Sequence, residues 1–413
     1  MTDETDYWAR RLGRSLSTVD VPSSTVDIVG VVRAGRARVR RRYAVAAAAV
    51  ATLALLAAPT ALAGWRGHGD DRPATHGPAG ADGPVSPGAR PFAPCRVSPL
   101  ELPADLVATG LTGMDAAGRY VTGDATRDDT QVSVRWDRGV PEILPVAAVR
   151  SSSNGVNTAG VVVGSAERSD GTWFPWVYRG GVVDTLPSPD GYPNFVQPLG
   201  VNAAGDIAGI GEDPTFHDTV ALLWPHDRPG TVRVLPTPAL PRTAVQMNVA
   251  GVADDGSVVG SVGDLDHAVP YSWDAAGRGA ALALPAGATS GFVAGVRGLW
   301  AFGGVTLAGQ DGARDGTLVQ NPVRWSLRTG QVEFVAPDLR GQARSGNSAG
   351  DVILDIQPAL VHAWRGVRLE GLTDRSATQP FAVNEAGATV VGLDVAPSAE
   401  GTVRTPVVWH CSD

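Results

Sequence analysis

The feature that most constrains the fold is an internal repeat that fills most of the chain after residue 100. One phrase is an Asn or Asp, a Gly three residues later, and a Val-rich run that usually ends in Gly. It occurs at residues 114–123, 156–164, 201–209 and 383–392, with Ala253 at the first position in 252–260, and without the last Gly at 346–354. A second phrase ends in Trp136, Tyr178, Trp224, Trp273, Trp325, Trp364 and Trp409, which lie 39 to 52 residues apart. Such a period predicts an array of supersecondary units.

The chemistry of each unit is that of turns and strands. Asn at the first position and Gly at the fourth suit a type I turn, because the Asx side chain caps the turn and Gly tolerates the exit geometry. Val-rich runs between such turns indicate strands. With a closing phrase such as VVDTLP (182–187), each unit has four short strands, as a propeller blade has. We therefore predict an all-β, seven-bladed β-propeller over residues 95–413. Strands exclude a helical solenoid, and a β-sandwich would not require seven equivalent units.

Two copies depart from the pattern. The fifth, at 293–309, lacks the Asn-x-x-Gly and is counted from its Trp325 phrase. The seventh ends at TPVVWHCSD (405–413) without its fourth strand, while CRVSPLELP (95–103) has the fourth-strand ending and no blade of its own. We predict that these two segments pair and close the propeller, because pairing leaves no open edges.

In that antiparallel register Cys95 meets Cys411, and these are the only two cysteines. We predict a disulfide between them, with two free thiols as the alternative. Closing a loop of this length stabilises a fold by about 5 kcal/mol in the chain-entropy model.

Ordinary structural roles are predicted for the recurring residues. The aromatic residue of each third strand fills the space between neighbouring blades. The Asn or Asp of the turn is a cap rather than a calcium ligand, because calcium loops place several carboxylates on alternate residues. The acidic pair Asp254 and Asp255 is an isolated case.

The N-terminal segment predicts where the protein is located. Residues 44–63 are apolar and about long enough to cross a bilayer as a helix. Six arginines between Arg33 and Arg42 precede this run and favour the cytoplasmic side. We predict an uncleaved anchor with the C-terminal part outside the membrane. The alternative is secretion after cleavage near Ala63, since Ala61-Leu62-Ala63 has the small-x-small form.

The predicted organisation has four parts. Residues 1–42 form a short cytoplasmic head, 43–65 a transmembrane helix, 66–94 a flexible Gly/Pro-rich linker, and 95–413 the propeller. His68 and His76, in the linker, are interpreted as solvated residues rather than metal ligands.

The alternation of the turn phrase with phrases such as His362-Ala363-Trp364 resembles the extracellular HAF-repeat family of bacteria. The resemblance covers about residues 100–411 and implies an exported, propeller-like repeat protein without assigned catalytic residues. The cytoplasmic head resembles the heads of actinobacterial membrane proteins that accompany sigma factors, which implies a regulatory partner in the cytoplasm.

Most motifs of catalysis are missing from the sequence. It contains no HExxH, CxxC, Walker-type loop or dinucleotide fingerprint, and its GxSxG string, at 346–350, lies in a copy of the turn phrase. The histidines of the repeat region have no ligand spacing, so we predict no catalytic residue, cofactor or metal. They are His217, His226, His267, His362 and His410. The net charge of −8 argues against a nucleic-acid partner. The predicted partners are the lipid bilayer, through residues 44–63, and an extracytoplasmic ligand or protein.

The function best suited to these features is a binding or sensing module outside the membrane. The alternatives are an extracytoplasmic enzyme of lyase or glycosidase type with a channel site, and a structural cell-surface protein. Residues that break the repeat are the candidates for a ligand face: Trp173, His217 and Trp300, with the polar loops 212–218 and 309–318.

Overall fold

We describe a computed structural model of the chain. It describes residues 95–411, apart from short gaps, and all of them belong to the compact unit Ala79–Asp413. The gaps are residues 193–194, 213–218, 239–246, 264–266, 310–319, 336–339, 350, 356–360, 363–366, 374–375 and 399–400. The predicted head, transmembrane helix and linker lie outside the described residues. In the part that is described, no helix is long and apolar enough to cross a membrane.

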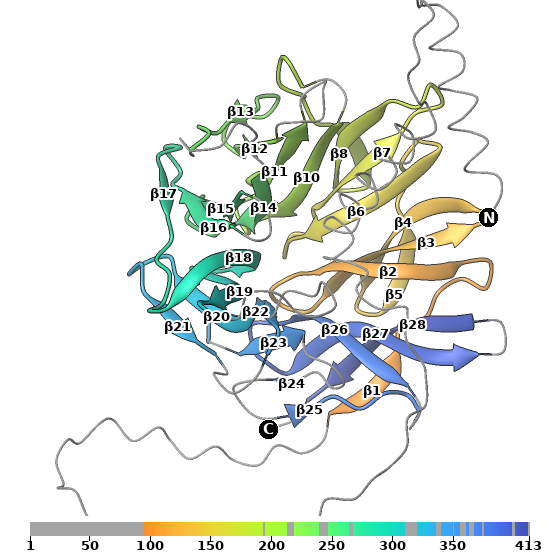
Figure 1. The fold of residues 1–413 in the computed structure, drawn as a ribbon. Helices are drawn as coiled ribbons and strands as arrows, with labels where there is room; N and C mark the ends of the chain where they lie inside the picture. The colour runs from red at the N-terminus through yellow and green to blue at the C-terminus, as the bar shows by residue number, and fades with distance from the viewer. Residues whose placement is uncertain are drawn as a thin grey trace, which may run out of the picture. The chain divides into compact units, whose positions relative to one another are not determined.

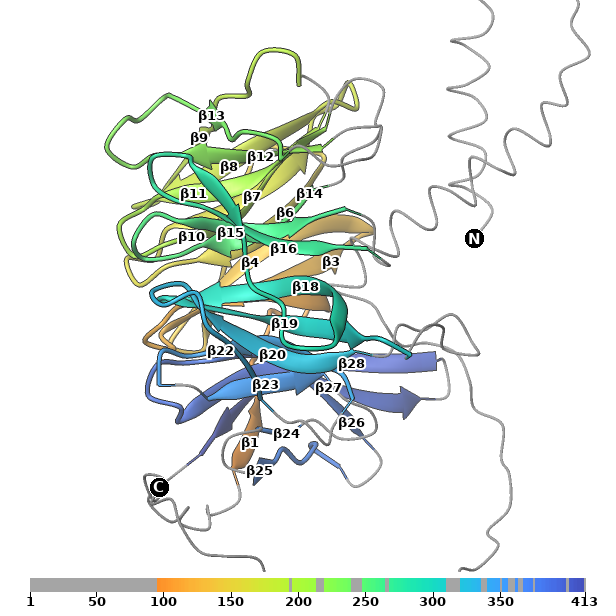
Figure 2. The same cartoon turned by 60° about the vertical axis from the view of Figure 1, so that its left-hand side comes forward.

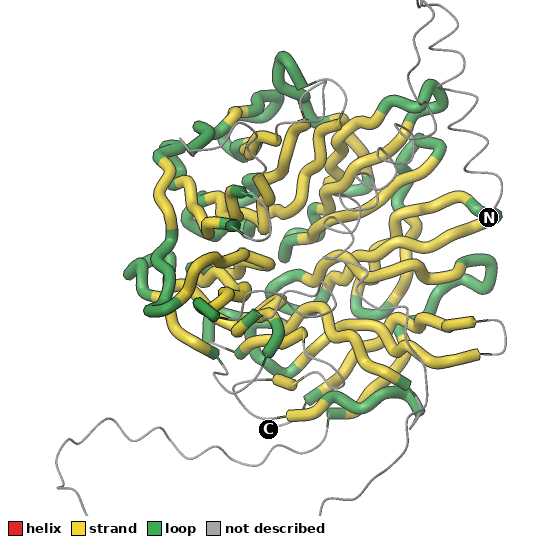
Figure 3. Tube along the Cα trace, in the orientation of Figure 1, coloured by secondary structure: helices red, strands yellow, loops and turns green. Residues whose placement is uncertain are grey.

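The described residues form strands and loops, as Figure 3 shows. Six sheets, here called blades 1 to 6, each contain four strands that follow one another in the chain. Blade 1 contains β2 (Val107–Met114), β3 (Tyr120–Arg127), β4 (Thr130–Asp137) and β5 (Val140–Ile143). Blade 2 contains β6 (Arg150–Val156), β7 (Val162–Glu167), β8 (Trp173–Arg179) and β9 (Val182–Thr185). Blade 3 contains β10 (Phe195–Val201), β11 (Ile207–Glu212), β12 (Thr219–Trp224) and β13 (Arg233–Val234).

The next three blades repeat this order. Blade 4 contains β14 (Met247–Val252), β15 (Val258–Val262), β16 (Val269–Trp273) and β17 (Gly279–Ala281). Blade 5 contains β18 (Ala288–Arg297), β19 (Trp300–Leu307), β20 (Asn321–Ser326) and β21 (Val332–Phe334). Blade 6 contains β22 (Gln342–Gly346), β23 (Val352–Asp355), β24 (Val361–His362) and β25 (Val367–Arg368). The predicted strand content is therefore confirmed, including the fifth copy, which keeps its strands despite the lost turn phrase.

The last sheet joins the two ends of the repeat region. This terminal sheet contains β26 (Ala377–Val383), β27 (Thr389–Ser398), β28 (Gly401–His410) and, beside β28, β1 (Arg96–Pro99). The strands β1 and β28 are antiparallel, with Arg96 opposite His410, as predicted. Figures 1 and 2 show the blades in chain order around a ring, with orange β1 beside blue β28. The terminal sheet contacts blade 6 through β26 and blade 1 through β2, so the ring is closed.

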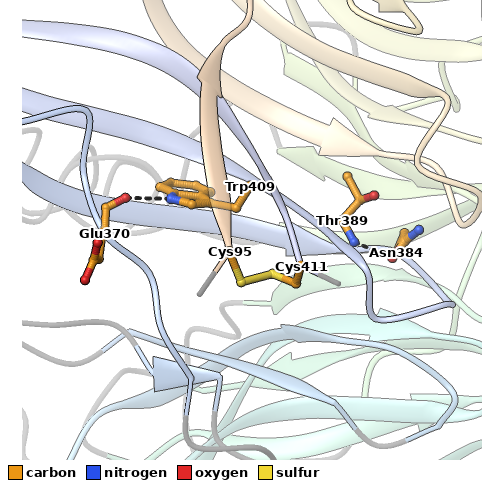
Figure 4. The surroundings of a disulfide bond; sticks show 6 residues. All are labelled: Cys95, Glu370, Asn384, Thr389, Trp409 and Cys411. Carbon is orange, nitrogen blue, oxygen red and sulfur yellow. Dashed lines mark hydrogen bonds between the residues drawn. A yellow bond between two sulfur atoms is a disulfide. The ribbon is translucent and has the colours of Figure 1, made fainter. Parts of the chain in front are cut away.

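The predicted disulfide is present. Cys95 and Cys411 are joined and lie 316 residues apart in the sequence (Figure 4). The backbone N–H of Cys411 also donates to the carbonyl of Ala388, which places the disulfide beside the turn between β26 and β27.

The aromatic residues of the third strands lie between sheets, as predicted. The indole rings of Trp136, Trp273, Trp325 and Trp409 are fully buried. Each described indole N–H of this series donates to a carbonyl in the closing phrase of the preceding sheet, which the sequence did not predict. The pairs are Trp136 with Glu101 (2.7 Å), Trp224 with Pro187 (2.8 Å), Trp273 with Pro236 (2.9 Å), Trp325 with Ala283 (2.7 Å) and Trp409 with Glu370 (2.7 Å). Because Glu101 follows β1, the N-terminal segment serves the terminal sheet as its closing phrase.

Glycines allow the strands nearest the ring axis to approach one another. A Cβ atom on Gly200 would lie 3.2 Å from the Cα atom of Gly251 in the next blade. The Gly that ends the Val-rich run has a related role, because a Cβ on Gly260 would lie 2.0 Å from the carbonyl oxygen of Asn248. These positions therefore require Gly for close backbone contact.

Candidate functional site

The turns between the first and second strands of the blades lie at one end of the ring, which we call the turn face. Side-chain amides link neighbouring turns across blade boundaries. Asn157 donates to the carbonyl of Asn202 (2.9 Å), Asn202 to that of Ala253 (3.0 Å), and Asn347 to that of Asn384 (3.1 Å). Strands are antiparallel within each blade, so the loops between third and fourth strands lie on the same face.

The Asn side chains also cap their own turns, as the sequence predicts. The Oδ1 atom of Asn202 accepts the backbone N–H groups of Gly205 (2.9 Å) and Asp206 (2.8 Å). The second bond, from the amide group to the next blade, was not predicted. The sequence signal for this second bond was the preference for Asn over Asp at the first position of the turn phrase. Only Asn can accept a hydrogen bond within its turn and donate one outside it.

In blade 5 Arg297 stands where blades 1, 2, 3 and 6 have an Asn or Asp cap and blade 4 has Ala253. Its guanidinium donates to the carbonyl of Met114 in blade 1 (2.7 Å). These two blades are not neighbours in the ring, so the side chain reaches across the axis at the turn face. Burial lowers the pKa of Arg297, while the charges of Glu385 and Asp115 act in the opposite direction.

A cavity of about 280 Å³ lies between blades 2 and 3 on the turn face. Its walls come from two turn phrases and from the loops that follow β8 and β12. The apolar part of the lining includes Val161, Leu186 and Trp224, and the polar part includes Arg179, His226 and Arg228. The loop after Trp224 contains Pro225, Pro229 and Gly230, which restrict or shape its backbone.

A chain of polar contacts positions one wall of this cavity. Asp206 accepts the backbone N–H of His226 (2.8 Å), lies 2.7 Å from its Nδ1 atom, and accepts an amide hydrogen of Asn202 (3.0 Å). Burial alone would raise the pKa of Asp206, but these hydrogen bonds hold it below its usual value. The hydrogen bond to Asp206 raises the pKa of His226. The histidine predicted to be a surface residue without a ligand role is therefore an ordered part of the cavity wall.

A second polar site is buried between blades 1 and 2. The carboxylate of Asp124, on β3, accepts the hydroxyl of Ser152 (2.6 Å) and the backbone N–H of Ser153 (2.9 Å) from β6. Gln131 donates to it from β4 (3.1 Å). Burial raises the pKa of Asp124 to about 6, although the bonds from Ser152 and Ser153 act in the opposite direction.

The three residues predicted for a ligand face are not gathered into one site. Trp173 begins β8, opposite Glu167, at the end of blade 2 away from the turn face. Its ring lies 6.1 Å from that of Phe195 and 5.2 Å from the guanidinium carbon of Arg150. Trp300 follows the turn of blade 5 on the turn face, and Arg324 lies over its ring at 4.5 Å. His217 and most of the loops 212–218 and 309–318 lie outside the described residues.

Among the residues with described positions, no group of three or more His, Cys, Asp or Glu side chains is arranged to hold a metal ion. The side chains of Asn157, Asn202 and Asn347 all accept backbone N–H groups of their own turns, and Asn202 and Asn347 also donate to the carboxylates of Asp206 and Asp351.

Comparisons with known proteins identify the fold. No protein-family model matches the sequence, and no curated protein matches it. The propeller domain of the Trilobed protease from Pyrococcus furiosus has a TM-score of 0.50 and 10% identity, covering 76% of this chain and 96% of that chain. An oligogalacturonate lyase from Vibrio parahaemolyticus has a TM-score of 0.50 and 11% identity, covering 76% of this chain and 93% of that chain. The chain has a β-propeller fold. At such identities the likeness shows the fold alone.

Proposed function

We propose that this protein is a membrane-anchored extracytoplasmic β-propeller that binds a ligand and acts as a binding or sensing module. The observation that carries the proposal is the cavity between blades 2 and 3, which combines an apolar lining with polar side chains, among them His226 held in place by Asp206. Ligand sites in proteins have this composition. The cytoplasmic head, residues 1–42, would offer a regulatory partner its binding site.

The location is supported by the disulfide between Cys95 and Cys411, because disulfides persist in oxidising compartments. Fusing alkaline phosphatase or green fluorescent protein to the C-terminus tests the topology. We expect an active phosphatase and a dark fluorescent protein, both in the membrane fraction. A fluorescent fusion would overturn the location, and a released protein starting after Ala63 would replace the anchor by secretion.

We further propose that the six blades and the terminal sheet act as one seven-bladed propeller of the HAF-repeat type. The support is that Asn157, Asn202 and Asn347 link neighbouring turns in the same way, and that five of the aromatic phrases bond the closing phrase of the preceding sheet. Native hydrogen exchange tests this unity. We expect the third strand of the terminal sheet, β28, to exchange as slowly as β12 and β16, and faster exchange confined to that sheet would contradict it.

One observation favours the enzyme alternative. Asp124 has a pKa of about 6, which suits a general acid. However, its side chain is only 6% exposed and its oxygens are bonded to Ser152, Ser153 and Gln131. A group so enclosed does not reach a substrate, so binding remains our first proposal. If the wild type cleaved an oligosaccharide by hydrolysis or elimination, and Asp124→Asn did not, the enzyme proposal would replace the binding proposal.

A further inference from the structure

The cavity between blades 2 and 3 is cationic in an acidic protein. Three of its lining residues, Arg179, His226 and Arg228, carry or can accept a positive charge. Asp206 is bonded to His226 and Asp227 contacts Arg228, so the positive charges exceed these two carboxylates by one when His226 is protonated. The whole chain has a net charge of −8. A local excess of cations against this background attracts anionic groups.

The cations differ in how firmly they are held. His226 is anchored through Nδ1 to Asp206, and its raised pKa favours the imidazolium form, in which Nε2 is a donor. Arg228 has only a 3.9 Å contact with its neighbour Asp227, and both side chains are exposed. Arg179 ends β8, immediately before the turn at Gly180 and Gly181. The two arginines are therefore placed on loops from different blades, on either side of one opening.

The remaining lining favours an apolar body. The indole N–H of Trp224 already donates to the carbonyl of Pro187 (2.8 Å), so the ring has no donor left for a ligand. Trp224 is only 3% exposed and Leu186 is also buried, so the apolar surface open to a ligand comes from half-buried lining residues such as Val161 and Pro225. A volume of about 280 Å³ is at the lower end of the range of ligand cavities, which is suited to a small, single-ring molecule.

We propose that this cavity binds a small carboxylic acid with an apolar aromatic or aliphatic body, the carboxylate lying between Arg179 and Arg228 and the body against Val161 and Pro225. This inference deepens the proposed function and depends on it. Arginine favours carboxylates because its planar guanidinium donates two parallel hydrogen bonds to their two oxygens. Recognition then requires both the charge and the apolar body.

The test uses three probes of matched size and different charge. Fluorine NMR titrations of the full-length protein in detergent would measure binding of 4-(trifluoromethyl)benzoate, 4-(trifluoromethyl)benzyl alcohol and 4-(trifluoromethyl)benzylamine. We expect the benzoate to bind at least about tenfold more tightly than the alcohol, and the amine most weakly. The double variant Arg179→Ala/Arg228→Ala should lower the benzoate affinity about tenfold, to that of the alcohol, without changing the alcohol affinity.

The matched control is Arg328→Ala. Arg328 is an exposed arginine in the equivalent loop of blade 5, outside the cavity, and its loss should leave benzoate binding unchanged. If the double alanine variant does not fold, Arg179→Gln/Arg228→Gln keeps the side-chain length and tests the same charge.

The outcomes separate the two proposals. Equal binding of benzoate and alcohol that the arginine variants leave unchanged would overturn the carboxylate class. A loss of both affinities on Val161→Trp, which fills the cavity from a half-buried position, would then keep the cavity as a ligand site. Benzoate binding that Arg328→Ala weakens as much as the double variant would also overturn the inference. Binding of none of the probes would overturn both the class and the cavity as the binding site.

Discussion

Blade 1 has two boundaries of different character. Against the terminal sheet it packs an apolar cluster that includes Leu111, Val121, Trp136, Val391 and Leu393. Against blade 2 it combines a second apolar cluster, to which Tyr120 and Leu144 belong, with buried hydroxyl and carboxylate groups. The first boundary joins segments from the two ends of the chain, and the second joins segments that are consecutive.

The polar boundary is built by hydrogen bonds between blades. Besides the bonds of Asp124, the hydroxyl of Ser133 donates to that of Ser151 (3.1 Å), and Thr112 lies within hydrogen-bond distance of Ser153 (2.9 Å). Buried hydrogen bonds contribute little net free energy but are costly to break singly. The comparison teaches that apolar burial and a disulfide close the ring at the place where the two ends of the repeat region meet.

Removing the disulfide should give the largest effect. The double variant Cys95→Ser/Cys411→Ser loses the constraint on a loop of 316 residues, so the free energy of unfolding should fall by on the order of 5 kcal/mol. Urea denaturation measures it. Reduction of the wild type by dithiothreitol should lower the stability similarly. A change below about 1 kcal/mol in both experiments would show that packing alone closes the ring.

A change of pH should have the second-largest effect on stability, and it should act through Asp124 at the polar boundary of blade 1. The pKa of Asp124 is higher in the folded protein, at about 6, than its ordinary value of 3.8. The folded state therefore holds the proton more tightly, and this stability is present below pH 4 and lost as the pH rises through 6. The shift corresponds to about 3 kcal/mol.

Asp124→Asn should remove this decrease, so that the variant equals or exceeds the wild type in stability at pH 7. Denaturation with urea at intervals from pH 4 to pH 8 checks it. Asp394→Asn, which removes a buried carboxyl group of the terminal sheet, is the matched control and should keep the decrease because Asp124 remains. The same slope in Asp124→Asn as in the wild type would contradict the assignment.

Shortening Trp136 at the apolar boundary should give the third-largest loss of stability. Trp136→Phe loses the bond to the carbonyl of Glu101 and leaves a small void, which should cost about 2 kcal/mol. Trp273→Phe, which loses the corresponding bond between blades 3 and 4, is the comparison. Similar losses in the two variants would show that the boundary between blade 1 and the terminal sheet is as stable as the boundary between blades 3 and 4. No loss for Trp136→Phe would show that the bond from Trp136 to Glu101 does not stabilise the boundary.

The sequence predicts features that repeat within one unit and fails for contacts between units. The turn caps, the four strands and the pairing of Cys95 with Cys411 follow from spacing, turn chemistry and the need to pair strand edges. The bond of Arg297 to Met114 and the meeting of Arg179 with Arg228 at one cavity depend on how separate blades are rotated about the axis. A linear period contains no such information.

The burial of Asp124 was missed for a related reason. Its Gly-Asp position follows the Val-rich run, where other copies have Ser165, Ile210 or Ser261, so the pattern shows only a variable residue. The partners, Ser152 and Ser153, come from the next unit. The run of three serines from Ser151 was the visible signal, because such polar residues are uncommon in a strand that must pack on both faces.

The smallest effect is expected at Tyr178, which takes the place of Trp at the polar boundary. Its hydroxyl donates to Glu142 of blade 1 (2.8 Å), and Glu142 also accepts from Arg135, whose guanidinium lies between the rings of Tyr120 and Tyr178. Tyr178→Phe should cost about 1 kcal/mol, because Glu142 keeps Arg135 as its partner.

A double-mutant cycle of Tyr178→Phe with Glu142→Gln isolates the bond from the packing of the ring. We expect a coupling energy of about 0.5–1 kcal/mol from urea denaturation. The cycle of Tyr178→Phe with Asp137→Asn, a carboxylate paired with Arg119 on the same blade, should give none and serves as the control. Equal coupling in both cycles would mean that Tyr178 responds to the charge of blade 1 as a whole. The hydroxyl would then not substitute for the indole N–H that joins the other boundaries.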